Sequence, residues 1–239
     1  MFFMLEIIKN SHYGQDKFKN KGIRFFDMKC KICASKTDAI EAKNKIYHHC
    51  NKCDFIFLDE AFFVSEEKEK ERYLKHQNSI ENKGYVAMFE KFLGDIDKIK
   101  KNIKTALDFG SGPNDVLKQL LERKNIQTDV YDAYFATEKI FENKKYDLIT
   151  CTEVLEHINN PLETLKLLKK HLNNKGILAI MTLFHPDIEQ FNSWWYITDE
   201  THITFYNKTT FEIIAKKLGF NIIYLDQKNT ILLESNSKV

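Results

Sequence analysis

The sequence contains little proline and glycine and no long apolar run. Only 3 Pro and 8 Gly occur among 239 residues, which excludes collagen-like and low-complexity disordered chains. No stretch approaches the roughly 20 consecutive apolar residues that cross a bilayer. The apolar run at 1–8 is short, contains Glu6 and lacks the flanking features of a signal peptide. We therefore expect a chain without a membrane partner that is long enough to bury a sizeable core.

A strong net charge is also missing. The 36 basic and 34 acidic side chains leave a formal charge of +2, which excludes a strongly basic nucleic-acid-binding protein, and no DNA partner is expected. The charge is unevenly spread, because residues 1–105 hold 21 basic and 16 acidic side chains whereas residues 106–239 hold 15 and 18. The basic first part and the acidic second part differ in texture as well, which indicates separate structural units.

Cysteines are few, but their spacing is informative. Cys30 and Cys33 form one Cys-x2-Cys pair, and Cys50 and Cys53 form a second pair sixteen residues later. This pattern is typical of a two-knuckle zinc site, and a closed shell of four thiolates indicates a structural rather than a catalytic ion. His48 or His49 could replace one ligand. The odd cysteine count favours a reducing compartment, so we expect a cytoplasmic protein.

The order of apolar patterns predicts an α/β fold. A charged run at 66–76 is typical of a solvated helix, with a partner-binding face as the alternative, and the apolar spacing over 85–96 predicts an amphipathic helix. Strands and helices then alternate, which predicts a doubly wound, mostly parallel sheet whose terminal strand pair allows one antiparallel edge strand. We divide the chain into an N-terminal segment and zinc ribbon at 1–60, a helical connector at 61–103 and the α/β domain at 104–239. The predicted strands are 105–109, 128–131, 146–151, 176–182, 221–225 and 230–233, and the predicted helices of the α/β domain are 116–124, 162–172 and 209–218.

A glycine-containing loop follows the first of these strands. It reads Asp108-Phe109-Gly110-Ser111-Gly112-Pro113, and glycines here allow a ligand to approach the backbone at a helix N-terminus. A dinucleotide site would need a third glycine where Asp115 stands, and the two acids would repel a pyrophosphate. Asp132 ends the next strand, where an acid can accept hydrogen bonds from ribose hydroxyls. The residues predict an adenosine-type, cationic ligand without phosphates.

Several segments resemble class I S-adenosylmethionine-dependent methyltransferases. The stretch Ala106–Pro113 is similar to their first motif, Asp132 to their ribose-binding acid, 146–157 to their fourth-strand motif and 176–178 to the strand that follows. The resemblance runs from Thr105 to Leu233 and implies a Rossmann-like, seven-stranded sheet. It also implies an S-adenosylmethionine site formed by Asp108, Phe109, Gly110, Ser111, Gly112, Asp132, Ala133, Thr152 and Glu153.

One departure from the family pattern concerns the third strand. Only thirteen residues, 133–145, separate Asp132 from the strand at 146, where the family usually fits a helix and a strand. We therefore expect the third strand to be shortened or missing, with the adenine packed against Tyr134 or Phe135.

The acceptor side is expected around two histidines and a long connection. His157 and His202 are candidate catalytic residues that would act as a general base or orient the acceptor, although structural roles remain open. Glu153, Glu156, His157 and His202 are similar to a set that binds a divalent ion in small-RNA terminal ribose methyltransferases and some ubiquinone-pathway O-methyltransferases. The connection at 183–206 contains the aromatic row Trp194, Trp195 and Tyr196, which we expect to line the substrate pocket.

These observations predict an enzyme that transfers a methyl group from S-adenosylmethionine. A small-molecule acceptor is favoured because the second half of the chain is acidic and the aromatic row is typical of pocket walls. The first alternative is an RNA methyltransferase whose zinc ribbon contacts RNA. The second is a non-catalytic cofactor-binding module that docks a protein partner.

Overall fold

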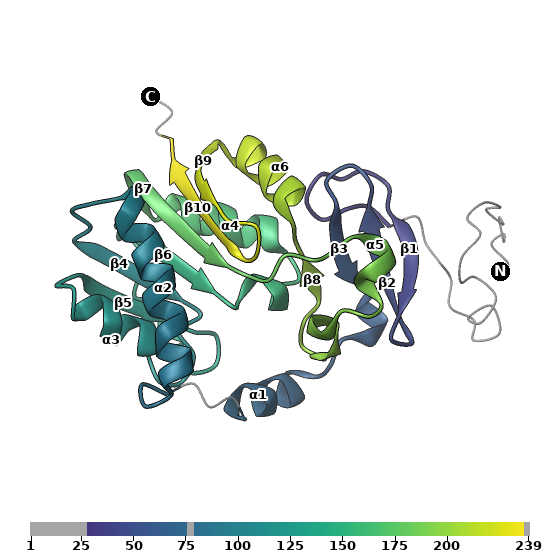
Figure 1. The fold of residues 1–239 in the computed structure, drawn as a ribbon, viewed down its shortest axis with the longest axis horizontal. Helices are drawn as coiled ribbons and strands as arrows, with labels where there is room; N and C mark the ends of the chain where they lie inside the picture. Colours follow the sequence, from purple (N-terminus) through teal and green to yellow (C-terminus); the bar gives the residue numbers. More distant parts are fainter. Residues whose placement is uncertain (1–27, 76–78, 237–239) are drawn as a thin grey trace, which may run out of the picture.

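The computed structural model describes residues 28–75 and 79–236, which form two β-sheets and the helices around them (Figure 1). The apolar run at 1–8 and the first part of the predicted N-terminal segment lie outside the described residues. Within the described ranges, no helix combines the length and the apolar character needed to cross a membrane.

The larger sheet confirms the predicted α/β class. Four neighbouring strands are parallel, and the central ones are buried along most of their length because helices cover both faces. Each predicted strand of the α/β domain is present within a few residues of its expected ends. In spatial order the six strands are β5 (Gln127–Tyr131), β4 (Thr105–Phe109), β6 (Tyr146–Thr152), β7 (Leu172–Met181), β10 (Thr230–Ser235) and β9 (Phe220–Leu225).

The antiparallel strand of this sheet is internal, so the prediction of an antiparallel edge strand was wrong. Strand β10 lies between β7 and β9 and is antiparallel to both. The edge position belongs to β9, because the chain first passes to the edge and the hairpin then returns β10 to the inside. At the other edge, β5 has β4 as its one neighbour, and residues 132–145 form turns and one isolated bridge. The third strand of the family pattern is therefore missing, as expected from the short spacing.

Four helices cover the two faces of the larger sheet. Successive strand side chains point to opposite faces, so that Leu148 packs in one apolar cluster and Ile149 in the other. The predicted amphipathic helix is present, and it buries Phe89 and Phe92 against the sheet. Helices α2 (Lys83–Ile99) and α3 (Val116–Glu122) belong to the first cluster, and α4 (Pro161–Lys170) and α6 (Lys208–Leu218) belong to the second.

The smaller sheet joins the cysteine-rich segment to the connection that follows β7. Strand β8 (Thr204–Phe205) pairs with β3 (Phe55–Leu58), so a strand from the predicted domain 104–239 completes the sheet of the predicted ribbon. The same connection supplies two short helices whose apolar side chains pack on this sheet. The remaining elements are β1 (Asp38–Ala42), β2 (Lys45–Cys50), α5 (Ile188–Phe191) and the 3-10 helix η4 (Trp195–Thr198).

The charged run forms a solvated helix, as predicted. Helix α1 (Glu66–Leu74) begins after Ser65, whose side chain caps it, and none of its residues is buried. It lies beneath the space between the two sheets in Figure 1. Two further 3-10 helices are η2 (Glu60–Phe62), before α1, and η3 (Leu155–His157), directly after β6.

Candidate active site

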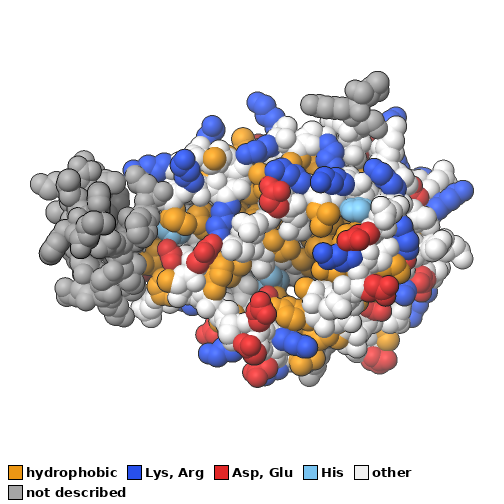
Figure 2. Space-filling model, turned by 180° about the vertical axis from the view of Figure 1, so that it is seen from behind, with side chains coloured by type: hydrophobic (Ala, Val, Ile, Leu, Met, Phe, Trp, Pro, Cys, Tyr) orange, Lys and Arg blue, Asp and Glu red, His pale blue; other side chains and the backbone are white. Residues whose placement is uncertain are grey.

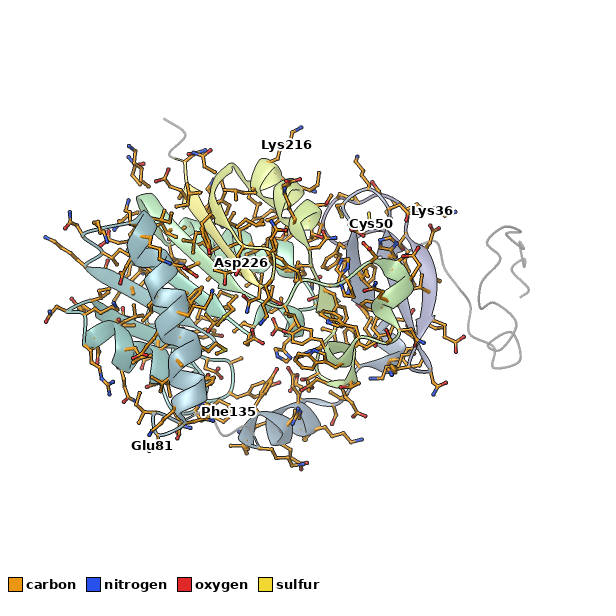
Figure 3. The ribbon with its side chains drawn as sticks, in the orientation of Figure 1. Lys36, Cys50, Glu81, Phe135, Lys216 and Asp226 are labelled. Atoms are coloured by element: carbon orange, nitrogen blue, oxygen red, sulfur yellow. The ribbon has the colours of Figure 1, made fainter. Side chains whose placement is uncertain are left out.

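A cavity of about 770 Å³ opens at the carboxyl ends of the parallel strands. This is the end at which open α/β sheets bind their ligands. The loops after β4, β5 and β6 line one part of the cavity, and the connection after β7 lines another part. Helices α1 and α2 and the turn between β9 and β10 supply the remaining walls, and Phe135 lies between the two helices in Figure 3.

The glycine loop after β4 requires glycine for two physical reasons. Gly110 has a φ of 83° and Gly112 a φ of 67°, a region that other residues seldom adopt. In addition, a Cβ atom at Gly110 would lie 2.2 Å from Cγ2 of Val154, which follows β6. The backbone N–H of Gly110 donates to the carbonyl of Tyr131 at 2.7 Å, so the loop is held against the end of β5. Phe109, Gly110, Ser111 and Gly112 all line the cavity.

Asp132 organises the opposite side of this part of the cavity. One carboxylate oxygen accepts a hydrogen bond from the N–H of Gly112 at 3.0 Å, and the other accepts from Tyr134 and Phe135 at 2.8 and 3.1 Å. Asp132 and Ala133 line the cavity together with both aromatic residues. The structure thus brings the glycine loop, the predicted ribose-binding acid and the two expected adenine neighbours into one place.

Asp108 lies below the cavity and is not among the residues that line it. Its carboxyl group is buried and accepts a hydrogen bond from the hydroxyl of Thr150 at 2.8 Å. Burial raises the pKa of Asp108 to about 7, because the hydrogen bond does not compensate for the lost solvation of the charge.

Two carboxyl groups, those of Glu153 and the fully buried Glu156, form the floor of the second part of the cavity together with a tyrosine. The hydroxyl of Tyr196 donates to Oε1 of Glu156 at 2.6 Å and lies 3.2 Å from Oε2 of Glu153. Loss of solvation within the cavity and the nearby charge of Glu156 raise the pKa of Glu153 to about 8. The second oxygen of Glu156 is buried and has no hydrogen-bond partner, which is unusual for a carboxylate.

The two predicted histidines lie beside this carboxylate, and their imidazole planes are inclined at 68° to each other. Nδ1 of His157 donates to the carbonyl of Thr201 at 3.0 Å, and Nδ1 of His202 donates to the carbonyl of Tyr196 at 2.8 Å. Each Nε2 is then left with its lone pair. Burial, with a contribution from His157, lowers the pKa of His202 to about 4, so its ring is neutral at pH 7.

One ligand atom from each of Glu156, His157 and His202 lies within 4.8 Å of the others. The fourth predicted member, Glu153, is not part of this group, although it lies next to it through Tyr196. Two imidazoles fixed by backbone carbonyls, with an unpartnered carboxylate oxygen, form a donor set that suits a divalent cation.

A family model described as a methyltransferase domain matches residues 71–225, which is well over half of the chain. The chain belongs to this methyltransferase domain family. The match begins within α1 and ends with β9, so it includes every residue that lines the cavity except Glu69, Lys228 and Asn229.

Three known proteins show a distant similarity to this methyltransferase domain. A ubiquinone biosynthesis O-methyltransferase from Rickettsia bellii (strain OSU 85-389) is 31% identical over 88 residues, which are 37% of this chain and 31% of that protein. The match thus spans about a third of that relative. An O-methyltransferase family protein from Burkholderia thailandensis is similar at 12% identity and a TM-score of 0.48, with 75% of this chain and 64% of that chain covered. The plantazolicin methyltransferase BpumL, in complex with a monoazolic desmethylPZN analog and SAH, is similar at 14% identity and a TM-score of 0.46, with 72% and 90% covered.

The aromatic row of this methyltransferase domain is divided between the cavity and the protein core. Trp195 and Tyr196 line the cavity, and the Trp195 side chain is 67% exposed. Trp194 is not among the lining residues, because it packs against Phe191 of α5 and Phe205 of the smaller sheet. Trp194 and Trp195 point in different directions because the chain enters η4 between them.

Four lining residues come from the helices and had not been singled out from the sequence. Glu69 and Tyr73 extend from α1, and Tyr85 and Met88 extend from α2. Glu69 and Tyr73 lie in the charged run, and their neighbours in that run are solvent-exposed. The sequence pattern therefore does not indicate that these two side chains reach a cavity. Tyr85 and Met88 continue the apolar stripe of α2 towards its N-terminus, beyond the part that packs on the sheet.

The four predicted zinc ligands converge in the smaller sheet. Their sulfur atoms lie within 4.8 Å of one another, with 3.4 Å between Cys30 and Cys53 and between Cys33 and Cys50. Zn–S bonds of about 2.3 Å in a tetrahedron place sulfurs about 3.8 Å apart, so the four thiols fit a zinc ion. The neighbouring imidazoles are engaged elsewhere, because Nε2 of His48 contacts Asp59 and Nε2 of His49 contacts Asp54.

Proposed function

We propose that this methyltransferase domain transfers the methyl group of S-adenosylmethionine to a hydroxyl group of a small molecule. The observation that carries the proposal is that one cavity joins two chemically different parts. One part has the glycine loop and Asp132, and the other has Glu156 with the imidazoles of His157 and His202. The first part suits an adenosine ligand, and the second suits a group that must lose a proton.

The charges along the cavity support a cationic cofactor. Four acids, Glu69, Asp132, Glu153 and Glu156, line it, whereas Lys228 is the one lysine or arginine in the lining drawn from the described residues. Acids favour the sulfonium and amino groups of S-adenosylmethionine and would repel a diphosphate. In this proposal, the glycine loop passes beneath the methionine part, Asp132 accepts from the ribose hydroxyls, and Thr152 and Glu153 line the sulfonium side.

The acceptor half needs to align a nucleophile and remove its proton. Methyl transfer is an in-line displacement on an already activated carbon, so positioning and exclusion of water provide much of the rate. Neutral imidazoles with a free Nε2 can accept a hydroxyl proton. Glu156, His157 and His202, with Glu153 nearby, also fit a divalent cation, which when bound would lower the pKa of an acceptor hydroxyl.

A small acceptor is favoured over RNA by the surroundings of the cavity. Four acids and one lysine line the cavity, so the phosphates of an RNA strand would be repelled there. Figure 2 shows the rear face, on which lysines and arginines are more frequent in the upper part and acids in the lower part. The relative from Rickettsia bellii is a ubiquinone biosynthesis O-methyltransferase, which is in accord with an oxygen acceptor. We also propose that the protein acts in the cytoplasm, where four thiols would remain reduced for zinc.

The cofactor half can be tested by calorimetry on the full chain with S-adenosylhomocysteine. We expect saturable binding, and Asp132→Asn should weaken it by about tenfold or more, since hydrogen bonds to a charged acceptor contribute about 1.5–3 kcal/mol. Asp38→Asn, a change at an exposed acid of the smaller sheet, is the matched control. Binding of a nicotinamide dinucleotide in place of S-adenosylhomocysteine would refute the proposal.

The acceptor half can be tested with labelled S-adenosylmethionine and a panel of catechols, other phenols and short RNAs. We expect transfer to a hydroxyl compound, stimulated by Mn²⁺ or Mg²⁺. His202→Ala should remove transfer while S-adenosylhomocysteine binding is retained. Methylation of RNA but not of small molecules would favour the first alternative, and cofactor binding without any transfer would favour the non-catalytic module.

A further inference from the structure

Helix α1 is held on the active site by one face and by little else. Glu69, Arg72 and Tyr73 lie three and four positions apart and so share one side of the helix. None of the nine residues of α1 is buried. A helix of nine residues is marginal in isolation, so its position depends on what these side chains contact.

Two of the three contacts bridge the two halves of the cavity. The hydroxyls of Tyr73 and Tyr134 donate to the two carboxylate oxygens of Glu69, at 2.5 and 3.0 Å. The ring of Tyr73 also lies edge-on to the imidazole of His157, with 5.2 Å between the ring centroids. Helix α1 therefore contacts both the expected adenine neighbour and a candidate catalytic residue.

The third contact is an ion pair between Arg72 and Asp199, which follows η4. Two guanidinium nitrogens lie 2.9 and 2.7 Å from Oδ2 of Asp199. The other oxygen, Oδ1, accepts from the backbone N–H and the hydroxyl of Thr201, at 3.1 and 2.7 Å. The N–H of His202 donates to the carbonyl of Asp199 at 3.2 Å, so this aspartate is the hub of a tight turn over 199–202.

This turn contains the carbonyl that fixes the imidazole of His157, and η4 contains the carbonyl that fixes the imidazole of His202. The carbonyl of Thr201 accepts from Nδ1 of His157, and that of Tyr196 accepts from Nδ1 of His202. Hydrogen bonds of this kind set the tautomer and direction of an imidazole. A continuous path of contacts thus leads from Arg72 on α1 to both Nε2 lone pairs.

We propose that Arg72 and Asp199 are positioning residues, and that docking of α1 through this ion pair orients the imidazoles of His157 and His202 towards the acceptor. The inference rests on the proposed role of those two histidines. Arg72 itself is not among the residues that line the cavity, so a direct role in holding cofactor or acceptor is not what the geometry indicates.

The test uses the full chain and the variants Arg72→Ala, Arg72→Lys and Asp199→Asn. Lys70→Ala is the matched control, since Lys70 is exposed on the same helix. Nitrogen-15 NMR of the histidine rings reports the tautomers, and calorimetry reports the binding of S-adenosylhomocysteine and of Mn²⁺. A change of fold would alter all three readouts, whereas a positioning role alters only the tautomers and Mn²⁺ binding.

We expect wild type and Lys70→Ala to show His157 and His202 with the hydrogen on Nδ1 alone. Arg72→Ala and Asp199→Asn should give mixed tautomers and raise the Kd for Mn²⁺ about three- to tenfold, less than for a residue that orients a ligand directly. Their affinity for S-adenosylhomocysteine should stay within about twofold of wild type, and Arg72→Lys should restore part of the loss.

Unchanged tautomers in Arg72→Ala would overturn the inference. So would a loss of S-adenosylhomocysteine affinity as large as the loss of Mn²⁺ affinity, because Arg72 would then hold the cofactor. A wild-type protein that binds no Mn²⁺ would count against the divalent ion of the proposed function alone, and the tautomer spectra would still decide the role of Arg72.

Discussion

The hydroxyl of Tyr196 donates a hydrogen bond of 2.6 Å to Glu156, a carboxylate that is fully buried beneath the cavity. Burial and the charges of Glu156 and Glu153 raise the pKa of Tyr196 well above its ordinary value, so the hydroxyl remains a donor at every physiological pH. The same hydroxyl also lies beside the more accessible carboxyl group of Glu153, and Tyr196 lowers the cost of burying Glu156.

Replacing Tyr196 by phenylalanine should make the cost of the buried carboxylate measurable as a loss of stability. In Tyr196→Phe, neither oxygen of Glu156 would have a side-chain donor, since Oε2 already lacks one. We expect the free energy of unfolding to fall by about 1–3 kcal/mol, the penalty for an unsatisfied buried polar group. Urea unfolding measures this change. Tyr224→Phe, at a half-buried tyrosine of β9, serves as the control and should change stability by less than about 0.5 kcal/mol. Equal effects of the two substitutions would contradict this account of Tyr196.

Much of the larger sheet could be predicted from the sequence because its signals are local. Apolar runs bounded by loops gave the strands, and the spacing of Phe89 and Phe92 gave the buried face of α2. The missing third strand followed from counting residues after Asp132. Pairing order is different, because the sequence of a hairpin does not state which of its two strands lies inside, and the position of β10 was therefore missed.

The candidate site shows the same division. Side chains at strand ends, such as Asp132 and Glu156, could be anticipated because parallel strands end at one edge of a sheet. Side chains that reach the cavity from distant helices could not, and Glu69 is one example. The separation of Trp194 from Trp195 depends on how the chain passes from α5 into η4, which no local pattern specifies.

The glycine loop provides a prediction with an internal control. Gly110→Ala would place a Cβ 2.2 Å from Val154 in a backbone conformation with φ of 83°, so strain and overlap add. We expect a loss of stability of about 2–4 kcal/mol and at least a tenfold loss of S-adenosylhomocysteine affinity. Gly94→Ala in α2 meets no atom within 4 Å and should stabilise the protein by about 0.5–1 kcal/mol. Urea unfolding and calorimetry distinguish the two, and a Gly110→Ala protein as stable as Gly94→Ala would show that the loop is not built as described.

The buried Asp108 predicts an unusual dependence of stability on pH. Its pKa is about 7 in the folded protein and about 3.9 in an unfolded chain, so between pH 4 and 7 the folded state holds one more proton. Stability must then fall as the pH rises through this window, with a slope of up to about 1.4 kcal/mol per pH unit from this group. Asp108→Asn should remove that slope, and Asp38→Asn should keep it. Urea unfolding at a series of pH values measures the three proteins, and parallel curves for wild type and Asp108→Asn would contradict the raised pKa.

Removal of zinc should disturb the acceptor half of the active site, because backbone hydrogen bonds join the cysteine-rich sheet to that half. The N–H of Leu58 in β3 donates to the carbonyl of Ile203 at 2.8 Å, and the N–H of Ile203 donates to the carbonyl of Glu156 at 2.7 Å. The hydroxyl of Thr210 in α6 also donates to the carbonyl of Cys53. The predicted ribbon is thus continuous with the strand that follows His202. Unfolding of the ribbon would therefore also disturb the acceptor half of the site.

We expect one zinc per chain in the purified protein and none in Cys33→Ser, which replaces the most accessible of the four thiols. Cys151→Ala should keep its zinc, since this fifth cysteine is buried in β6 and is not part of the cluster. Cys33→Ser should melt at a lower temperature, and it should lose Mn²⁺ affinity by a larger factor than S-adenosylhomocysteine affinity, because the ribbon supports β8 and Glu156 rather than the glycine loop. Metal analysis, calorimetry and thermal unfolding check these three outcomes. A zinc-free Cys33→Ser that melts with wild type and binds both ligands equally well would show that the four thiols have no structural role.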